Sequence, residues 1–458
     1  MKLKVINPAT GEVAATLPAD DAKSVAAKYA RARAAQPAWA RVRLKQRLNA
    51  IARFRELVAG NIELLAQVLT TEVGKPISQS RNELKGVLPR IDFFLEETSH
   101  VLRAEKIHEE PDGSLEERIS HEPLGVIANI SAWNYPWFVG SNVFVPALLA
   151  GNTVLYKPSE FASLTGAEIA RLLFEAGVPQ DAFIPVIGGG KVGEALLAQA
   201  VDGVFFTGSV ATGKRIATAI AGRMIKLQLE LGGKDPVYVC DDVEIGKAAA
   251  GIADGAFYNT GQSCCSVERI YVEQGVFDAF VEKFVAEVRK FKRGDPRDDN
   301  TYIGPLTRAP QLKVLEAQVK DAVKKGAKLI AGGKRVKGRG NWFDPTVLVD
   351  VDHSMAVMRD ETFGPVIGIM AVRDDDHALE MMNDTPYGLT AGVYANDRQR
   401  AQRILSKVRS GSVYWNCCDR VSPRLPWSGV GDSGVGLTLS RYGIETFTRP
   451  KAWHLRSA

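Results

Sequence analysis

Two adjacent cysteines, Cys264 and Cys265, follow a Gly-Gln pair in the segment NTGQSCCSVER, residues 259–269. A cysteine that acts as a nucleophile needs a nearby base or an environment that lowers its pKa. The segment ERIYVE after the pair predicts a strand, and adjacent side chains in an extended chain point to opposite faces. We therefore expect at most one of the two thiols to face a given site. The alternative is that both are small core residues, because free cysteine is among the most buried residue types.

Metal binding and Cys-His hydrolysis fit the thiols less well. The chain has five cysteines, and neither adjacent pair has the two-residue gap of a zinc knuckle. The six histidines are scattered. His353 and His377 lie near acidic loops without a second motif around them. We expect no metal site.

A candidate base lies in the segment IKLQLELGG. Leu227, Leu229 and Leu231 alternate with polar residues, which predicts a half-buried strand that ends at Glu230. A carboxylate at a strand end beside a glycine turn is well placed for general-base catalysis. A surface strand with a single glutamate has the same pattern, so this signal does not decide by itself.

The segment GGGKVG has the spacing of a dinucleotide-binding fingerprint. Gly188, Gly190 and Gly193 match GxGxxG between an expected strand and an expected helix. The fingerprint also requires an acidic residue about 20 positions later, and Gly213-Lys214 stands there instead. A tight turn from strand to helix explains the same glycines.

Two other segments compete for a dinucleotide. In FFTGSVATGK, a strand runs into Gly208 and Ser209, and a helix follows whose N-terminal amides could hold a phosphate. In LYKPSE, Lys157 and Glu160 follow a strand, at the end where ligands of open α/β sheets lie. A carboxylate there could accept both hydroxyls of an adenosine ribose, and a solvated loop is the alternative.

The composition is that of a soluble globular protein. The 458 residues are 45% hydrophobic and 24% charged, with a net charge of +5. Opposite charges alternate along most of the chain, so we expect no nucleic-acid partner. The N-terminus lacks the features of a secretory signal, and the longest apolar run, 143–156, is too short to span a bilayer. With cysteines that do not form a disulfide framework, these features predict a cytoplasmic protein without membrane association.

The elements that must position these groups follow two patterns. Residues 20–105 carry apolar residues at helical spacing. From about residue 119, short apolar runs alternate with helical stretches, which indicates a parallel sheet with helices on both faces. A second α/β cycle begins at a seam near 232–240, and the segment 111–125 departs from the first sheet.

The whole chain resembles the NAD(P)-dependent aldehyde dehydrogenase superfamily. The resemblance rests on motifs in family order: WNYP, KPSE, FTGSVATG, LELGGKDP, NTGQSC, ETFGPV and PWSGVGDSGVG. It implies an α/β fold with a Rossmann-like cofactor domain, an α/β catalytic domain and a small oligomerisation hairpin. The implied boundaries are 1–104 and 124–232 for the NAD-binding domain, 233–430 for the catalytic domain, and 105–123 and 431–458 for the oligomerisation segments.

The resemblance assigns the catalytic roles. The family nucleophile falls on Cys264, the general base on Glu230 and the oxyanion-stabilising asparagine on Asn134. It thereby implies oxidation of an aldehyde to a carboxylic acid through a thiohemiacetal and a thioester. Family members that pass the acyl group to coenzyme A commonly lack the glutamate, so Glu230 implies a free acid as product.

The resemblance also assigns the binding residues. NAD is the implied cofactor, with NADP as the alternative, because a 2′-phosphate would meet the Glu160 carboxylate while Lys157 partly offsets it. The implied cofactor residues are Trp133, Lys157, Glu160, Gly208, Ser209, Gly213, Glu361 and Phe363, so the GxGxxG match becomes a decoy. The residues expected to line the aldehyde tunnel are Tyr135, Phe138, Tyr258 and Trp415.

The substrate and two rival classes stay open. Aromatic walls suit an apolar or aromatic aldehyde, or a quaternary ammonium through cation–π contact. In contrast, Arg420 or Arg424 could hold the carboxylate of a semialdehyde or could make structural pairs. The rivals are a reductive or coenzyme-A-acylating enzyme and an inactive protein that kept the fold. The resemblance implies a homodimer or homotetramer.

Overall fold

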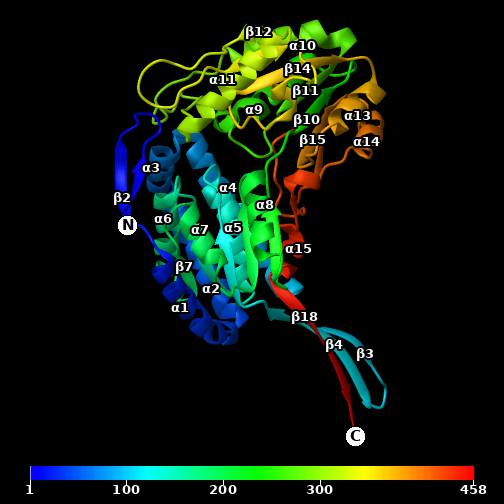
Figure 1. Ribbon diagram of the computed structural model, residues 1–458. Helices are drawn as coiled ribbons and strands as arrows, with labels where there is room; N and C mark the ends of the chain where they lie inside the picture. Colours follow the sequence, from blue (N-terminus) through cyan, green and yellow to red (C-terminus); the bar gives the residue numbers. More distant parts are fainter. Residues whose placement is uncertain (1, 458) are drawn as a thin grey trace.

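The computed structural model describes residues 2–457, whose strands form four sheets. Two of these sheets are large and mainly parallel, and helices cover both faces of each (Figure 1). The predicted α/β class, with a Rossmann-like part and a second α/β part, is confirmed.

The first large sheet has the strand order β17-β9-β8-β5-β6-β7. Its strands are β5 (Val126–Ile130), β6 (Thr153–Lys157), β7 (Phe183–Pro185), β8 (Gly203–Thr207), β9 (Lys226–Glu230) and β17 (Gly434–Val435). All pair in parallel except β17, which is antiparallel to β9. The order reverses between β5 and β8, and ligands of such sheets bind outside the carboxyl ends of the strands at this switch point.

Side chains of this sheet alternate between two cores. Val126 and Ala128 pack in one cluster with residues of α1, α7 and α8, whereas Ile127 packs on the other face with α2 to α6. Strands buried on both faces are typical of parallel sheets. The prediction of a half-buried strand ending at Glu230 is corrected accordingly. Gln228 and Glu230 of β9 are buried rather than solvent-facing, because the segment that follows β17 packs on them. A Cβ at Gly436 would lie 3.2 Å from the Gln228 side chain, and the Thr438 hydroxyl donates to Glu230.

Nine helices of the described chain surround the first sheet. They are α1 (Ala22–Arg41), α2 (Leu44–Gly60), α3 (Ile62–Val73), α4 (Ile77–Val101), α5 (Pro136–Leu149), α6 (Ser163–Glu175), α7 (Gly190–Leu197), α8 (Val210–Ile220) and α15 (Ser440–Glu445). The helices α5 and α8 start directly after β5 and β8, so their N-termini lie at the switch point.

The second large sheet has the strand order β12-β13-β14-β11-β10-β15-β16. Its strands are β10 (Pro236–Val239), β11 (Arg269–Glu273), β12 (Lys328–Ala331), β13 (Thr346–Val349), β14 (Val366–Val372), β15 (Thr390–Tyr394) and β16 (Ser412–Trp415). Its helices are α9 (Ile245–Phe257), α10 (Phe277–Val288), α11 (Ala309–Lys324), α12 (Ala356–Arg359), α13 (Asp375–Asn383) and α14 (Arg398–Leu405). The helices α9 and α10 pack on one face and α11 to α14 on the other.

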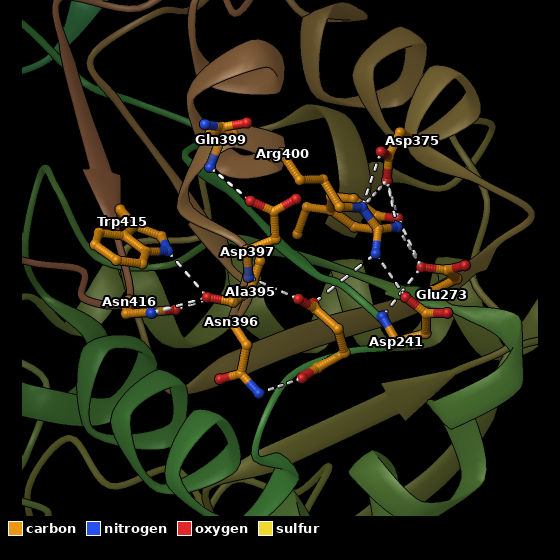
Figure 2. A network of polar contacts seen from close by, with 12 residues as sticks. Asp241, Glu273, Asp375, Ala395, Asn396, Asp397, Gln399, Arg400, Trp415 and Asn416 are labelled. Atoms are coloured by element: carbon orange, nitrogen blue, oxygen red, sulfur yellow. Dashed lines mark hydrogen bonds and ion pairs between the residues drawn. The ribbon is translucent and has the colours of Figure 1, made fainter.

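Arg400 fills the corresponding switch point of the second sheet. Its guanidinium donates to Asp241 after β10, to Glu273 at the end of β11 and to Asp375 at the start of α13 (Figure 2). The bidentate contact with Asp375 adds geometric specificity. The crevice at the carboxyl edge is therefore closed by side chains, and the site of this sheet lies at its amino edge.

Two small antiparallel sheets complete the fold. The strands β3 (Glu105–Glu109), β4 (Leu115–Pro123) and β18 (Thr448–Arg456) form an arm that projects from the body (Figure 1). A hairpin of β1 (Lys2–Ile6) and β2 (Val13–Pro18) precedes the first helix. None of the described helices combines the length and the apolar character that a membrane span requires.

Candidate active site

Two cavities meet at Cys264 and Glu230. The carboxyl edge of the first sheet supplies the segments after β5, β8 and β9, and the amino edge of the second sheet supplies those before β10, β11 and β14. The first cavity has a volume of about 540 Å³ and the second of about 270 Å³. Cys264 and Glu230 are the two residues that line both.

A strained turn presents Cys264. In this turn, Asn259, Thr260 and Gly261, which precede Cys264 by three to five positions, have φ values of 52°, 59° and 70°. A left-handed conformation is costly for a β-branched residue such as Thr260 and persists only where the surroundings fix it. Here Gln262 fixes it, since its side chain donates to the Asn259 carbonyl and accepts from the Thr307 N–H.

The extended conformation predicted for the cysteine pair is wrong. The chain turns at 264–266, where the Ser266 N–H donates to the Ser263 carbonyl, and the strand β11 begins only at Arg269. Both thiols line the first cavity, so the expectation that at most one of them faces a given site is also wrong. The contacts of each thiol distinguish the pair instead.

The two thiols have different surroundings. Cys264 is half-buried and lies between the cavities, while Cys265 is 5% exposed and belongs to the core of the first sheet. The Cys265 thiol donates to the Asp419 carboxylate, with 2.9 Å between Sγ and Oδ1. The neighbouring Cys264 side chain and burial raise the pKa of the Cys265 thiol well above its ordinary value. Cys265 is therefore held as a thiol, and Cys264 is the candidate nucleophile.

Glu230 ends β9 at the junction of the cavities. Its Oε1 accepts a hydrogen bond from the Thr438 hydroxyl, and the Trp427 side chain also interacts with this carboxylate. Burial raises the pKa of Glu230 to about 7, against the opposing effect of the Thr438 hydrogen bond and the Arg90 charge. A carboxylate with this pKa is a suitable base near neutral pH.

Asn134 lies after β5, beside the turn that carries Cys264. Its side-chain amide donates to the Gln262 backbone carbonyl at 3.1 Å, and the backbone carbonyl of Asn134 accepts a hydrogen bond from the Asn259 side chain. These bonds fix the amide and leave its second N–H without a partner among the described residues. Asn134 lines the second cavity and supplies a donor next to Cys264.

The second cavity is lined at one end by aromatic rings and by the Glu361 carboxylate. Trp133 and Phe363 contact edge to face, with 5.5 Å between ring centroids. Glu361 accepts a hydrogen bond from the Gly233 N–H, and burial followed by the Glu268 charge raises the pKa of Glu361 to about 8. A Cβ at Gly232 would lie 2.4 Å from the Glu361 carboxylate, so a larger residue there would displace this side chain.

The other end of this cavity is the N-terminus of α8. Gly208 and Ser209 line the cavity, and the Ser209 side chain does not cap the helix backbone. The first amides of α8 are therefore available for an anion such as a phosphate. A flat ring binding at Trp133 and Phe363, a ribose at Glu361 and a phosphate at α8 fit the nicotinamide half of a dinucleotide.

The remaining predicted cofactor residues lie outside the residues that line this cavity. Lys157 ends β6 and is buried, and Glu160 follows in the next loop, toward the far side of the switch point. Gly213 lies within α8, where a Cβ would lie 2.5 Å from the Leu231 side chain, so it allows close packing of the helix on β9. The GxGxxG segment enters α7 and lines neither cavity.

Tyr135, Phe138 and Tyr258 line the first cavity, as expected for the aldehyde tunnel. Trp415 does not line it. Trp415 is 38% exposed on β16, and its ring nitrogen donates to the Ala395 carbonyl (Figure 2). The segment after β16 reaches the cavity instead, through Asp419 and Arg420.

Sequence reasoning missed several residues that the structure brings to the cavities. They are Gln262, Arg308 and Gln311 in the second cavity, Arg90 and Asp419 in the first, and Thr438 beside Glu230. The GQ pair was the one available signal, for Gln262. The others lie far from the motifs in the sequence, and only the fold brings them close.

The comparisons with known proteins cover nearly the whole chain. The model of the "Aldehyde dehydrogenase family" matches residues 1–453. A glutarate-semialdehyde dehydrogenase from Pseudomonas putida is 36% identical over 451 residues, 98% of this chain and 93% of that protein. A putative succinate-semialdehyde dehydrogenase [NADP(+)] from Mycobacterium ulcerans is 37% identical over 443 residues, 96% of this chain and 86% of that protein. The crystal structure of an NAD-dependent aldehyde dehydrogenase from Sinorhizobium meliloti superimposes with a TM-score of 0.96 at 33% identity, covering 100% of this chain and 91% of that one.

Proposed function

The chain belongs to the aldehyde dehydrogenase family, and we propose that it oxidises an aldehyde to the free carboxylic acid through a covalent intermediate on Cys264. The observation that carries this proposal is the junction of the two cavities at Cys264 and Glu230. One thiol there reaches an aldehyde in the first cavity and a nicotinamide in the second.

The first half of the reaction forms a thioester. The Cys264 thiolate adds to the carbonyl carbon, a C–S bond forms, and the carbonyl oxygen becomes an oxyanion. The free N–H of the Asn134 amide and the backbone N–H of Cys264 stabilise this charge, and one such donor contributes about 3–4 kcal/mol in comparable sites. When bound, the nicotinamide ring supplies the acceptor for the hydride that leaves the tetrahedral carbon.

The second half releases the acid. Glu230 accepts a proton from a water molecule, whose oxygen attacks the thioester carbon. The C–S bond then breaks, and the Cys264 thiolate is restored. The position of Glu230 at the junction of the two cavities and its pKa of about 7 support this role. Glu230 also argues against transfer of the acyl group to coenzyme A.

A panel of aldehydes tests the function. We expect the purified protein to produce NADH, followed by absorbance, with at least one of aliphatic, aromatic, semialdehyde and betaine-type substrates. No added coenzyme A is needed, because water is the acyl acceptor. Failure of every aldehyde, or strict dependence on coenzyme A, would contradict the proposal.

NAD is the proposed preferred cofactor. A 2′-phosphate near Glu160 meets a like charge, which Lys157 offsets only in part. We expect kcat/KM to be at least tenfold higher with NAD than with NADP, and Glu160→Gln to narrow this ratio by roughly tenfold, as loss of one charge repulsion implies. Quenching of tryptophan fluorescence gives both dissociation constants independently of turnover. An equal or higher affinity of the unaltered protein for NADP, the cofactor in the name of the Mycobacterium ulcerans relative, would reject this preference.

We also propose a homodimer or homotetramer in the cytoplasm. The arm of β3, β4 and β18 projects from the body (Figure 1), and the edge strand β16 exposes Val413 and Trp415. An unpaired edge strand with apolar side chains is a surface that proteins usually cover. The five free cysteines support a reducing compartment.

A further inference from the structure

Arg90 is a buried cation that faces the first cavity. It belongs to α4, is 6% exposed and lines the cavity that also contains Cys264 and Glu230. Its guanidinium stacks over the Phe138 ring at 3.9 Å from the centroid. Its one hydrogen bond to a described residue goes from Nη1 to the Asn142 side-chain oxygen at 3.2 Å.

Arg90 forms no ion pair within residues 2–457, in contrast to two buried lysines of the chain. Lys75 pairs with Glu83, and Lys234 pairs with Glu268. Arg269 is fully buried and donates to four carbonyl oxygens, which leaves it saturated. A buried charge without a partner is costly, so an unpaired guanidinium at a cavity indicates a place for an anion.

Arg47 is a second buried arginine without a carboxylate, but it is not among the residues that line either cavity. Its Nη1 donates to the Ala40 carbonyl near the end of α1. Arg90 is therefore the buried, unpaired guanidinium that shares a cavity with the candidate nucleophile.

The surroundings of Arg90 form a slot for a short chain. Phe138 stacks in parallel with Tyr135 at 5.7 Å, and the Lys75 ammonium lies 3.7 Å from the Tyr135 ring centroid. Gly86 lies one turn before Arg90 on α4, where a Cβ would lie 2.8 Å from the Phe138 ring. This glycine lets the ring approach α4 and fixes the plane on which the guanidinium lies.

The carboxylates of this cavity already have donors of their own. Glu83 accepts from Lys75 and from the Trp137 N–H. Asp254 accepts from the Tyr302 hydroxyl, and Asp419 from the Cys265 thiol. Glu230 accepts from Thr438. None of them forms an ion pair with Arg90, so its free N–H groups remain for a substrate.

We propose that Arg90 binds the terminal carboxylate of an aldehyde acid, a semialdehyde whose carbonyl carbon reaches Cys264. This inference rests on the proposed function. The planar guanidinium donates two parallel hydrogen bonds to a carboxylate, and the apolar rings beside it accept the methylene groups between the two ends. Arg90 thus replaces the arginines that the sequence offered. Arg420 is exposed at the cavity and donates to the Asp419 carbonyl, and Arg424 is exposed and absent from the lining.

A second role for Arg90 makes a different prediction. Its charge lowers the pKa of Glu230, so Arg90 could act on the reacting groups rather than on the substrate. In that case its loss would slow every aldehyde, even at a pH where Glu230 is fully ionised. If Arg90 binds a carboxylate, its loss affects only substrates that carry one.

The test compares Arg90→Met with the unaltered enzyme on paired substrates, succinate semialdehyde with butanal and glutarate semialdehyde with pentanal. We expect Arg90→Met to lower kcat/KM for the better semialdehyde by about 100-fold, mainly through KM, because the carboxylate loses a charged partner in a buried site. For the neutral aldehydes, compared at pH 9 where Glu230 is ionised in both proteins, we expect kcat/KM to change less than threefold. Arg90→Lys keeps the charge but loses the planar guanidinium. Its kcat/KM for the semialdehyde should lie between those of Arg90→Met and the unaltered enzyme. It also serves if the methionine variant does not fold.

Controls separate the outcomes. Arg424→Gln is the matched control and should keep the selectivity. Inhibition by succinate and glutarate measures the carboxylate site without turnover and should weaken in parallel with KM. Three results would overturn the assignment. The first is an equal loss of kcat/KM for neutral and acidic aldehydes in Arg90→Met, and the second is a loss of selectivity in Arg420→Gln instead. The third is that the unaltered enzyme shows no preference for semialdehydes. Neutral aldehydes would still be oxidised in that last case, whereas failure of the proposed function would abolish turnover of all substrates.

Discussion

We expect Cys264→Ala to abolish aldehyde oxidation, with kcat reduced at least 10⁴-fold. Losses of this order follow the removal of a nucleophile from a preorganised site. The physical reason is that a trigonal aldehyde does not readily give up hydride, and only the adduct with the Cys264 sulfur creates the tetrahedral carbon that does. Alanine removes a half-buried thiol at the junction of two cavities, so the change in packing is small. Steady-state NADH absorbance measures the loss.

Two controls make this result specific. Fluorescence titration with NAD should give the same dissociation constant for the variant, which shows an intact second cavity. Cys265→Ser keeps a donor for Asp419 and should retain at least a tenth of the turnover. A Cys264→Ala protein that still oxidises its best aldehyde at the original rate would remove the basis of the mechanism.

Much of the fold follows from patterns that local physics produces. Strands β5, β6 and β8 are continuous apolar runs followed by glycine or polar turns and helices, which is how a parallel sheet appears in a sequence. The hairpin of β1 and β2 was not predicted. Strand β1 alternates between exposed lysines and the more buried Leu3 and Val5, but the hairpin is short and mostly exposed, so the signal is weak.

The active-site residues also divide into those that the sequence could predict and those that it could not. Gly208 and Ser209 could be predicted because a phosphate-binding turn needs those residue types between a strand and a helix. Arg90 could not, because an arginine on a helix gives no indication of which cavity it will face. Glu230 was placed at the correct end of its strand, but its burial depends on the segment that follows β17, which lies more than 200 positions later in the chain.

Glu230→Gln separates the two halves of the reaction. Glutamine keeps an oxygen that can accept the Thr438 hydroxyl, but it cannot take a proton from water. We expect rapid-mixing measurements to show a burst of about one NADH per site, followed by steady turnover reduced at least 100-fold, because the thioester accumulates. In the unaltered enzyme, steady turnover should rise with pH through about 7, as Glu230 loses its proton, and this rise should vanish in the variant. A variant that keeps both the burst and the steady rate would remove Glu230 from the mechanism.

The same substitution should stabilise the protein, and the sign follows from the pKa. Burial raises the pKa of Glu230 from 4.5 to about 7, so the folded state holds the proton more tightly than the unfolded state. The unaltered protein therefore loses stability as pH rises from about 4.5 through 7, by up to roughly 3 kcal/mol at 1.36 kcal/mol per pKa unit. Glutamine has no charge to bury, so the Tm of the variant should exceed that of the unaltered enzyme at pH 8 and come closest to it below pH 4.5, where Glu230 is protonated in both states. Such a gain on loss of activity is expected where a base is kept in a buried site for its chemistry at the expense of stability.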